Sequence, residues 1–321
     1  MIVASCPLRI SLVGGSTDHP EFLRRYRRGA VISFPSNLRT YITIHRDVFG
    51  INTIDENYNL NYSRRETVKN VSDIQNEMLR HCFEYLNVER INCSLVSDIY
   101  SAGSGLAASS AYLQALIKAI HVWRNDSITE FEVCKIAEQI ERKFNPLVGQ
   151  QDFYGSMGGL KRINFFSEID PQFTYLDTKI FDFMDIHLLY TGVLRSSTKV
   201  LESIDVSKSQ VLVSDVDNLE KAIRNVDVDA FNTIMNKSWQ NKKQTSNLIC
   251  ENEVLVDLDN KLSYDSRVLS HKLCGAGNGG YFLIFSHKNS YLEKEYDKCS
   301  RINISETGLK YVNLTNEFTR T

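Results

Sequence analysis

The chain has 321 residues, of which 42% are hydrophobic and 24% charged, so it is long enough to form more than one packed core. Lys and Arg total 37 against 39 Asp and Glu, and this net charge of −2 gives no electrostatic basis for binding nucleic acid. The 7 cysteines include no Cys-x-x-Cys pair, and no segment reaches the apolar length of a membrane span. Composition therefore predicts a cytoplasmic protein that binds neither nucleic acid nor membrane.

Apolar runs of two kinds alternate along the chain. Three short runs have the composition of strands, at residues 39–45, 91–96 and 161–166. Three longer segments repeat apolar residues at helical spacing, at residues 72–86, 109–123 and 129–141. The last opens on Thr129-x-x-Glu132, which predicts a capping box. The mixture predicts an α+β protein. The polar segment 167–179, followed by the apolar run 185–191, predicts two domains, residues 1–180 and 181–321.

The loop Gly-Ser-Gly-Leu-Ala-Ala-Ser-Ser-Ala at residues 103–111 lies between a strand-like run and a helical pattern. Gly103 and Gly105 permit a tight turn and a close approach of backbone to an anion, and the following helix would present unpaired N–H groups. Ser109 and Ser110 add hydroxyls in its first turn. The pattern predicts a phosphate-binding loop, although a plain glycine-rich turn with a serine cap has the same sequence features.

The same loop also fits the G-x-G-x-x-A fingerprint of dinucleotide-binding folds, from Gly103 to Ala108, with Asp126 at a suitable spacing for a ribose contact. That fold places the fingerprint near the start of a repeating strand–helix unit, whereas residues 1–102 precede it here and include several strand-like runs. No Walker A sequence is present, because Gly-Lys-Ser and Gly-Lys-Thr do not occur. A nicotinamide-dependent oxidoreductase stays open as a second interpretation.

Glycines also gather in three other loops, at residues 14–15, 149–159 and 275–280. The last of these leads into the apolar run Tyr281–Phe285, which predicts a buried strand. A glycine loop that enters a strand favours close approach of the backbone to a ligand or to another loop.

With these loops the chain resembles the GHMP small-molecule kinases, whose three motifs occur here in order. The first resembles Pro7–Ile10 with Gly14–Asp18, the second Gly103–Ala111 and the third Lys272–Gly280. Between them, residues 140–143 and 149–159 resemble the family segment that carries a metal ligand and the catalytic aspartate.

Two further segments are most similar to the D-glycero-D-manno-heptose 7-phosphate kinase branch of that family. These are the Gly-Gly-Ser-Thr-Asp sequence that ends at Asp18, and Leu189–Gly192 followed by the Arg-Ser-Ser sequence at 195–197. The resemblance implies an enzyme that uses ATP and Mg²⁺ to phosphorylate the anomeric hydroxyl of a heptose 7-phosphate, giving the 1,7-bisphosphate. A fucose- or galactose-type sugar 1-kinase and a catalytically silent homologue that binds sugar and nucleotide are the alternatives.

The resemblance also implies a fold and a set of site residues. The fold is a ribosomal-S5-like N-terminal domain and a ferredoxin-like C-terminal domain with the active site between them, and a homodimer is compatible with it. Asp152 would be the catalytic base, and Ser109 and Glu141 the magnesium ligands. The ATP-binding residues would be Gly103, Ser104, Gly105, Leu106, Ala107, Ala108, Ser109 and Ser110. The substrate-binding residues would be Arg9, Gly15, Ser16, Thr17, Asp18, Arg195, Gly275, Ala276 and Gly277.

Two positions depart from the family pattern. Ala107 and Asn278 stand where relatives have glycine. Asparagine tolerates a positive φ better than other non-glycine residues, so position 278 is compatible with the family loop. If the backbone at Ala107 requires a positive φ, we expect the loop to have shifted, with ATP affinity the property affected.

Overall fold

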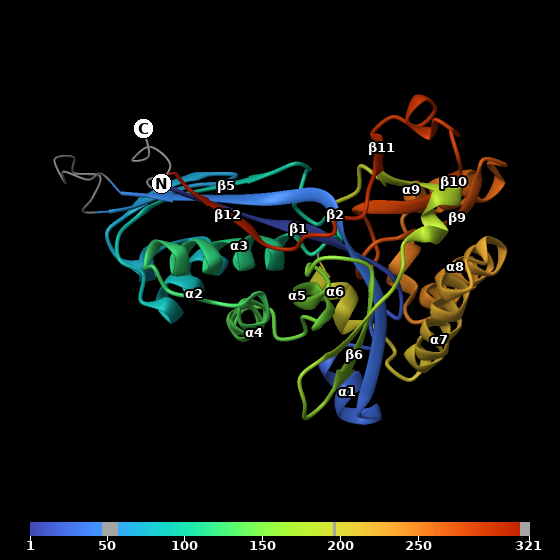
Figure 1. Cartoon of the computed structure of the whole chain (residues 1–321), viewed down its shortest axis with the longest axis horizontal. Helices are drawn as coiled ribbons and strands as arrows, with labels where there is room; N and C mark the ends of the chain where they lie inside the picture. Colours follow the sequence, from blue (N-terminus) through green and yellow to red (C-terminus); the bar gives the residue numbers. More distant parts are fainter. Residues whose placement is uncertain (47–56, 195–196, 315–321) are drawn as a thin grey trace.

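The computed structural model describes residues 1–46, 57–194 and 197–314. These residues form an eight-stranded sheet and a four-stranded sheet, which lie towards opposite ends of the molecule with helices packed against both (Figure 1). The predicted α+β class is confirmed.

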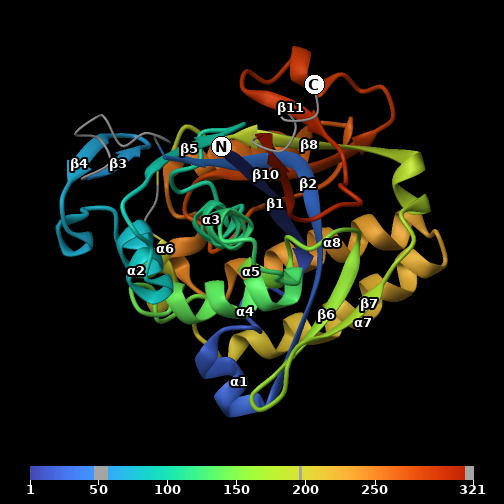
Figure 2. The ribbon, with the colours of Figure 1, turned by 60° about the vertical axis from the view of Figure 1, so that its left-hand side comes forward.

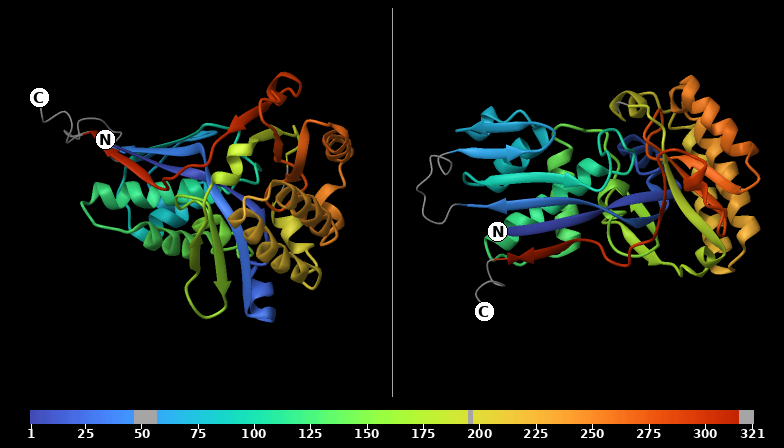
Figure 3. Two further views of the ribbon diagram at one scale, coloured as in Figure 1. Left: turned by 45° about the vertical axis from the view of Figure 1, so that its right-hand side comes forward. Right: turned by 90° about the horizontal axis from the view of Figure 1, so that it is seen from above.

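The first sheet is built around two long strands, β1 (Ile2–Val13) and β2 (Arg28–His45), which pair antiparallel. Its main order is β12-β1-β2-β5-β3-β4. Strand β6 pairs with the first residues of β2, and β7 pairs with β6, close to α1 (Figures 2 and 3). The register of β1 on β2 shifts between Pro7 and Arg9, because proline has no N–H to continue the ladder. The other members are β3 (Tyr58–Asn61), β4 (Arg65–Val68), β5 (Asn92–Ser97), β6 (Lys161–Phe166), β7 (Gln172–Tyr175) and β12 (Lys310–Asn313).

Helix α3 (Ala108–Trp123) packs its apolar face against β1 and β2, as the helical spacing predicted. Helix α4 (Glu130–Glu141) begins with the predicted capping box and ends at Glu141. Helix α2 (Glu77–Leu86) begins later than predicted, because the side chain of Asn76 accepts a hydrogen bond from Leu79 N (3.1 Å) and starts the helix there. Within the described part of the chain, every helix is too short or too polar to cross a membrane.

The second sheet has the order β11-β8-β10-β9, and each neighbouring pair is antiparallel. Its strands are β8 (Met184–Tyr190), β9 (Val268–Leu273), β10 (Tyr281–His287) and β11 (Cys299–Ile302). The helices of this half are α6 (Ser197–Glu202), α7 (Val211–Arg224), α8 (Val228–Lys243) and α9 (Glu253–Tyr264). Helix α8 packs on β9, and α7 packs on α8 and also contacts β2, so these helices join the two halves.

The segment after β11 returns to the first sheet. The amide of Gly159 donates to Ser305 O (3.0 Å), and β12 then pairs antiparallel with β1. All four strands of the second sheet follow residue 180, but β12, which also follows it, belongs to the first sheet. The division at residues 180 and 181 stays a prediction.

The loop between β1 and α1 (Pro20–Tyr26) is fixed by the start of β2. The Thr17 hydroxyl lies 2.7 Å from Gly14 O and accepts from Ala30 N (3.0 Å). The carbonyl of Thr17 lies so close to Gly29 that a Cβ there would be 1.9 Å from its oxygen. The contact leaves room only for glycine and fixes the position of Asp18.

Gly29→Ala is therefore expected to lower the free energy of unfolding by about 1–3 kcal/mol, because the loop must move to admit the methyl group. Gly15→Ala is the matched control, since a Cβ at Gly15 would meet Gln151 at an ordinary 3.6 Å. Denaturant unfolding measures both variants, and equal stabilities would contradict this account of the loop.

Candidate active site

A cavity of about 970 Å³ lies where the motifs of the two halves meet. Its walls come from the loop after β1, the loop before α3, the end of α4, the short helix α5 (Gln151–Tyr154), α8 and the glycine loop before β10. Segments far apart in the sequence thus share one space, as a substrate site requires.

The loop before α3 has the backbone of an anion-binding loop. Gly103 (φ 63°), Gly105 (φ 78°) and Ala107 (φ 58°) are all left-handed, and α3 has no side-chain cap at its first residue. The first turn of this sixteen-residue helix therefore lies at the cavity with N–H groups that no side chain caps. Such groups favour binding of an anion. Ala107 adopts the left-handed conformation itself, at a cost of about 1–2 kcal/mol, so a displaced loop is not required.

Glu141 ends α4 beneath the first turn of α3 and is almost fully buried. Its Oε2 accepts a hydrogen bond from the Ser110 hydroxyl (2.6 Å). The pKa of Glu141 is raised from 4.5 to about 7, chiefly by burial and with a smaller contribution from the nearby Asp152, and hydrogen bonds from Ser110, Asn145 and Ser109 limit the rise. Among the described residues, no cationic side chain forms an ion pair with this carboxylate.

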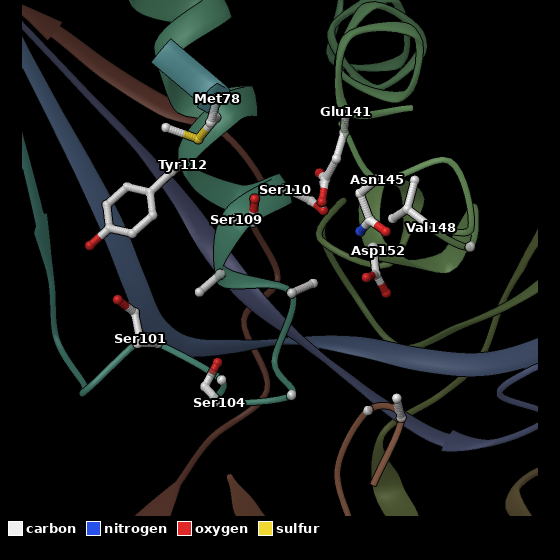
Figure 4. A pocket seen from close by; sticks show the side chains of 18 of the residues that line it. Met78, Ser101, Ser104, Ser109, Ser110, Tyr112, Glu141, Asn145, Val148 and Asp152 are labelled. Atoms are coloured by element: carbon white, nitrogen blue, oxygen red, sulfur yellow. Dashed lines mark hydrogen bonds between the residues drawn. The ribbon is translucent and has the colours of Figure 1, made fainter. Parts of the chain in front are cut away.

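These residues fit a magnesium ion. Hydroxyl and carboxylate oxygens are its preferred protein ligands, and the buried Oδ1 of Asn145 has no hydrogen-bond partner. Figure 4 shows Glu141, Asn145 and Asp152 on one side of the start of α3. No three His, Cys, Asp or Glu side chains of the described residues form a metal cluster, so phosphate and water oxygens would have to complete the coordination. Of the two serines, Ser110 is already bonded to Glu141 and Ser109 is the exposed one.

Asp152 lies on α5 and is tied to the glycine loop through Arg9. Arg9 is only 3% exposed, and its guanidinium donates to Asp152 Oδ1 from Nε (3.2 Å) and from a second nitrogen. Its remaining nitrogen donates to Gly105 O (3.0 Å). The side chain of Asp152 stays one quarter exposed towards the cavity. Arg9 also lines the cavity, so its role as a substrate-binding residue stays a prediction, and its observed bonds position Asp152.

Asp18 is fully buried beside α5. Its carboxylate accepts from the amide (2.9 Å) and from the side-chain Nε2 (2.8 Å) of Gln151. Burial, reinforced by the negative charge of Asp152, raises the pKa of Asp18 to about 6. A Cβ at Gly149 would lie 2.0 Å from this carboxylate, so the turn before α5 needs glycine to admit it.

Several predicted site residues do not line the main cavity. Thr17 is completely buried and holds the loop, as described above, and Leu106 is a core residue. Gly15 lines a small neighbouring pocket, and a Cβ at Gly277 would meet Ile249 at 2.8 Å. Their assignment as ligand-binding residues stays a prediction.

The remaining assignments fall as follows. Gly275 and Ala276 line the cavity together with Ser16, Asp18, Arg9 and the residues of the glycine loop other than Leu106. Arg195 lies outside the described residues. Sequence analysis did not identify Gln151 and Asn145 as site residues. The only signals in the sequence are that Gln151 adjoins Asp152 and that Asn145 follows Glu141 by about one helical turn.

The opposite side of the loop has a different chemistry. Tyr112, Met78 and Ser101 lie there, away from the carboxylates (Figure 4). This mixture of aromatic, apolar and hydroxyl groups suits a flat heterocycle better than a sugar.

The family model described as the GHMP kinases N terminal domain matches residues 74–159. The matched range includes the glycine loop, Glu141 and Asp152. A curated relative, D-glycero-alpha-D-manno-heptose 7-phosphate kinase of Campylobacter jejuni, is 27% identical over 300 residues, 87% of each chain. The predicted resemblance to the family and to its heptose kinase branch is confirmed.

Solved structures share the fold. A D-glycero-D-manno-heptose 1-phosphate kinase from Bacteroides thetaiotaomicron matches with a TM-score of 0.74 at 17% identity, over 98% of this chain and 99% of that chain. A galactokinase from Lactococcus lactis, complexed with galactose, matches with a TM-score of 0.73 at 14% identity, over 96% and 95%. The predicted GHMP kinase fold is confirmed. It excludes the dinucleotide interpretation of the loop, since β5 pairs antiparallel with β2 instead of beginning a parallel strand–helix repeat.

We expect Mg²⁺ to stabilise the protein more at about pH 8 than at about pH 6. The pKa of Glu141 is raised from 4.5 to about 7, so the folded protein holds this proton more tightly than the unfolded chain. The carboxyl therefore lowers the free energy of unfolding as pH rises through that window. A cation on the ionised carboxylate offsets the loss, and melting temperatures with and without Mg²⁺ measure it.

Glu141→Gln should remove the pH dependence of the Mg²⁺ effect, while Glu84→Gln, at an exposed position of α2, should retain it. A Mg²⁺ effect that is unchanged in Glu141→Gln would contradict the assignment of this residue as a ligand.

Proposed function

We propose that the protein is an ATP-dependent sugar kinase that transfers the γ-phosphoryl group to the anomeric hydroxyl of a heptose 7-phosphate. The observation that carries the proposal is that Arg9 donates hydrogen bonds both to Asp152 and to Gly105 O. These bonds hold the carboxylate of Asp152 beside the glycine loop. Phosphoryl transfer needs a phosphate cradle, a divalent cation and a group that orients the acceptor hydroxyl. The cavity supplies residues for each.

The nucleotide would lie along the start of α3. The amides of the first helical turn and of the Gly103–Ala107 loop suit its phosphates, and the wall that includes Tyr112 suits its base. Ser109 and Glu141 would hold Mg²⁺, which neutralises charge on the phosphates when bound.

The acceptor sugar would lie between Asp18 and Asp152. A carboxylate accepts hydrogen bonds from adjacent hydroxyls, which suits Asp18 for holding the ring. Asp152 accepts or orients the proton of the attacking hydroxyl as its O–H bond breaks and the new O–P bond forms; the bond between the γ-phosphorus and the β–γ bridging oxygen breaks and ADP leaves. Arg9 holds the carboxylate of Asp152 in place through this step by donating hydrogen bonds to it.

The assignment of the substrate is supported by the named substrates of similar proteins. The Campylobacter relative is named for a heptose 7-phosphate, and the structurally similar Bacteroides protein for a heptose 1-phosphate. Both named substrates are phosphorylated heptoses, and the relative with the higher identity favours the 7-phosphate. A galactose-type sugar 1-kinase is the alternative, supported by the fold it shares with galactokinase. A silent sugar-binding homologue is disfavoured, because Asp152, Glu141 and the loop amides are all in place.

The direct test is a panel of sugars and sugar phosphates incubated with ATP and Mg²⁺ and read by phosphorus NMR. We expect a new phosphoryl group at the anomeric position of D-glycero-D-manno-heptose 7-phosphate. Much faster transfer to a free hexose would overturn the substrate assignment and leave the kinase assignment standing.

In the same assay, Asp152→Asn should lower turnover by about 100- to 10,000-fold, because it keeps the size of the side chain but removes its charge and most of its proton-accepting capacity. Calorimetric ATP affinity should stay nearly unchanged. Asp257→Asn, at an exposed position of α9, is the matched control. Near-normal turnover of a well-folded Asp152→Asn protein would rule out a catalytic role.

A further inference from the structure

A buried histidine that lines the cavity has a ring nitrogen without a hydrogen-bond partner. His19 is 4% exposed, and its Nδ1 accepts from Glu21 N (3.2 Å). In the neutral ring this bond leaves the hydrogen on Nε2, which is buried without a hydrogen-bond partner although His19 lines the cavity. A buried donor without a partner is costly, so a ligand acceptor at this point is favoured.

A cation from the other half of the molecule lies beside it. Lys242 of α8 is 8% exposed and donates to the hydroxyl of Ser16. Its ammonium is near enough to His19 to lower the pKa of the imidazole, together with the larger effect of burial. Ser16 itself has a positive φ of 80°, which is uncommon for a residue other than glycine. All three residues line the same cavity.

The three groups favour an anion over a neutral hydroxyl. An ammonium, an imidazole N–H and a hydroxyl all supply hydrogens, and the nearest cavity carboxylate along the chain, Asp18, is directed to Gln151 instead. A cationic N–H donor forms its strongest hydrogen bonds with an ionised acceptor, and a phosphate offers several oxygens to donors that lie side by side.

Hydrogen bonds and chain neighbours also link these groups to Asp152. Lys242 donates to Ser16, which precedes Asp18 by two residues. Asp18 accepts from Gln151, the residue before Asp152. The acceptor hydroxyl would lie at Asp152. A substrate with its reacting hydroxyl at Asp152 would therefore extend its far end towards Lys242.

We propose that His19, Ser16 and Lys242 bind the phosphate group that the sugar substrate already carries, and so select a sugar phosphate over the free sugar. The inference rests on the proposed function and names the residues that decide its substrate class.

The test compares heptose 7-phosphate with the dephosphorylated heptose in the full-length protein. Lys242→Met keeps the aliphatic chain and removes the charge, and His19→Asn keeps an acceptor near Nδ1 and removes Nε2. Each should lower kcat/KM for the 7-phosphate about 10- to 100-fold, mainly through KM, with little change for the free heptose or in the KM for ATP. Lys237→Met, at an exposed position of the same helix, is the matched control.

A merely structural role would lower kcat/KM for both sugars by the same factor, and that result, or no change in either, would overturn the inference. Ser16→Ala supplies the same comparison if a larger change prevents folding. Calorimetric affinities without ATP separate the two proposals: wild-type protein that binds the 7-phosphate but transfers nothing would contradict the kinase function, while the loss of affinity in Lys242→Met would still support the phosphate site.

Discussion

The site depends on one buried guanidinium. Arg9 lies in a strand whose other side chains are almost all buried and apolar, so its charge must be paired within the protein. Its partners, Gly105 O and Asp152, lie 96 and 143 residues away along the chain. The cost of leaving this charge unpaired therefore fixes the glycine loop and α5 relative to each other. In the proposed function, that constraint sets the distance between a phosphate bound by the loop and the Asp152 carboxylate.

The rest of the cavity balances charge around this pair. Asp18 and Glu141 are buried carboxylates with raised pKa values, and each lies near the negative charge of Asp152. Such a site is electrostatically incomplete without cations or hydroxyl donors, which is the condition that favours binding of a sugar and a divalent ion. Lys242 supplies a positive charge from the opposite half, so the charge balance of the cavity depends on the position of α8.

Much of this arrangement could be predicted from the sequence, because the glycine loops, the helical spacing of α3 and the capping box of α4 are local signals. The contacts that assemble the site are not local. The sequence around Arg9 does not indicate that this side chain binds Asp152. The sequence around Thr17 likewise does not indicate that its hydroxyl accepts a hydrogen bond from Ala30 N. The pairing of β12 with β1 could not be predicted from the sequence either, because strands that are distant along the chain pair without a local sequence signal.

The central claim is that Asp152 and the glycine loop form one site for phosphoryl transfer. A crystal structure with heptose 7-phosphate, Mg²⁺ and a non-hydrolysable ATP analogue tests it most directly. The account predicts the anomeric hydroxyl within hydrogen-bonding distance of Asp152 and in line with a terminal phosphate held by the loop before α3. A sugar bound elsewhere, or an anomeric hydroxyl directed away from Asp152, would contradict it.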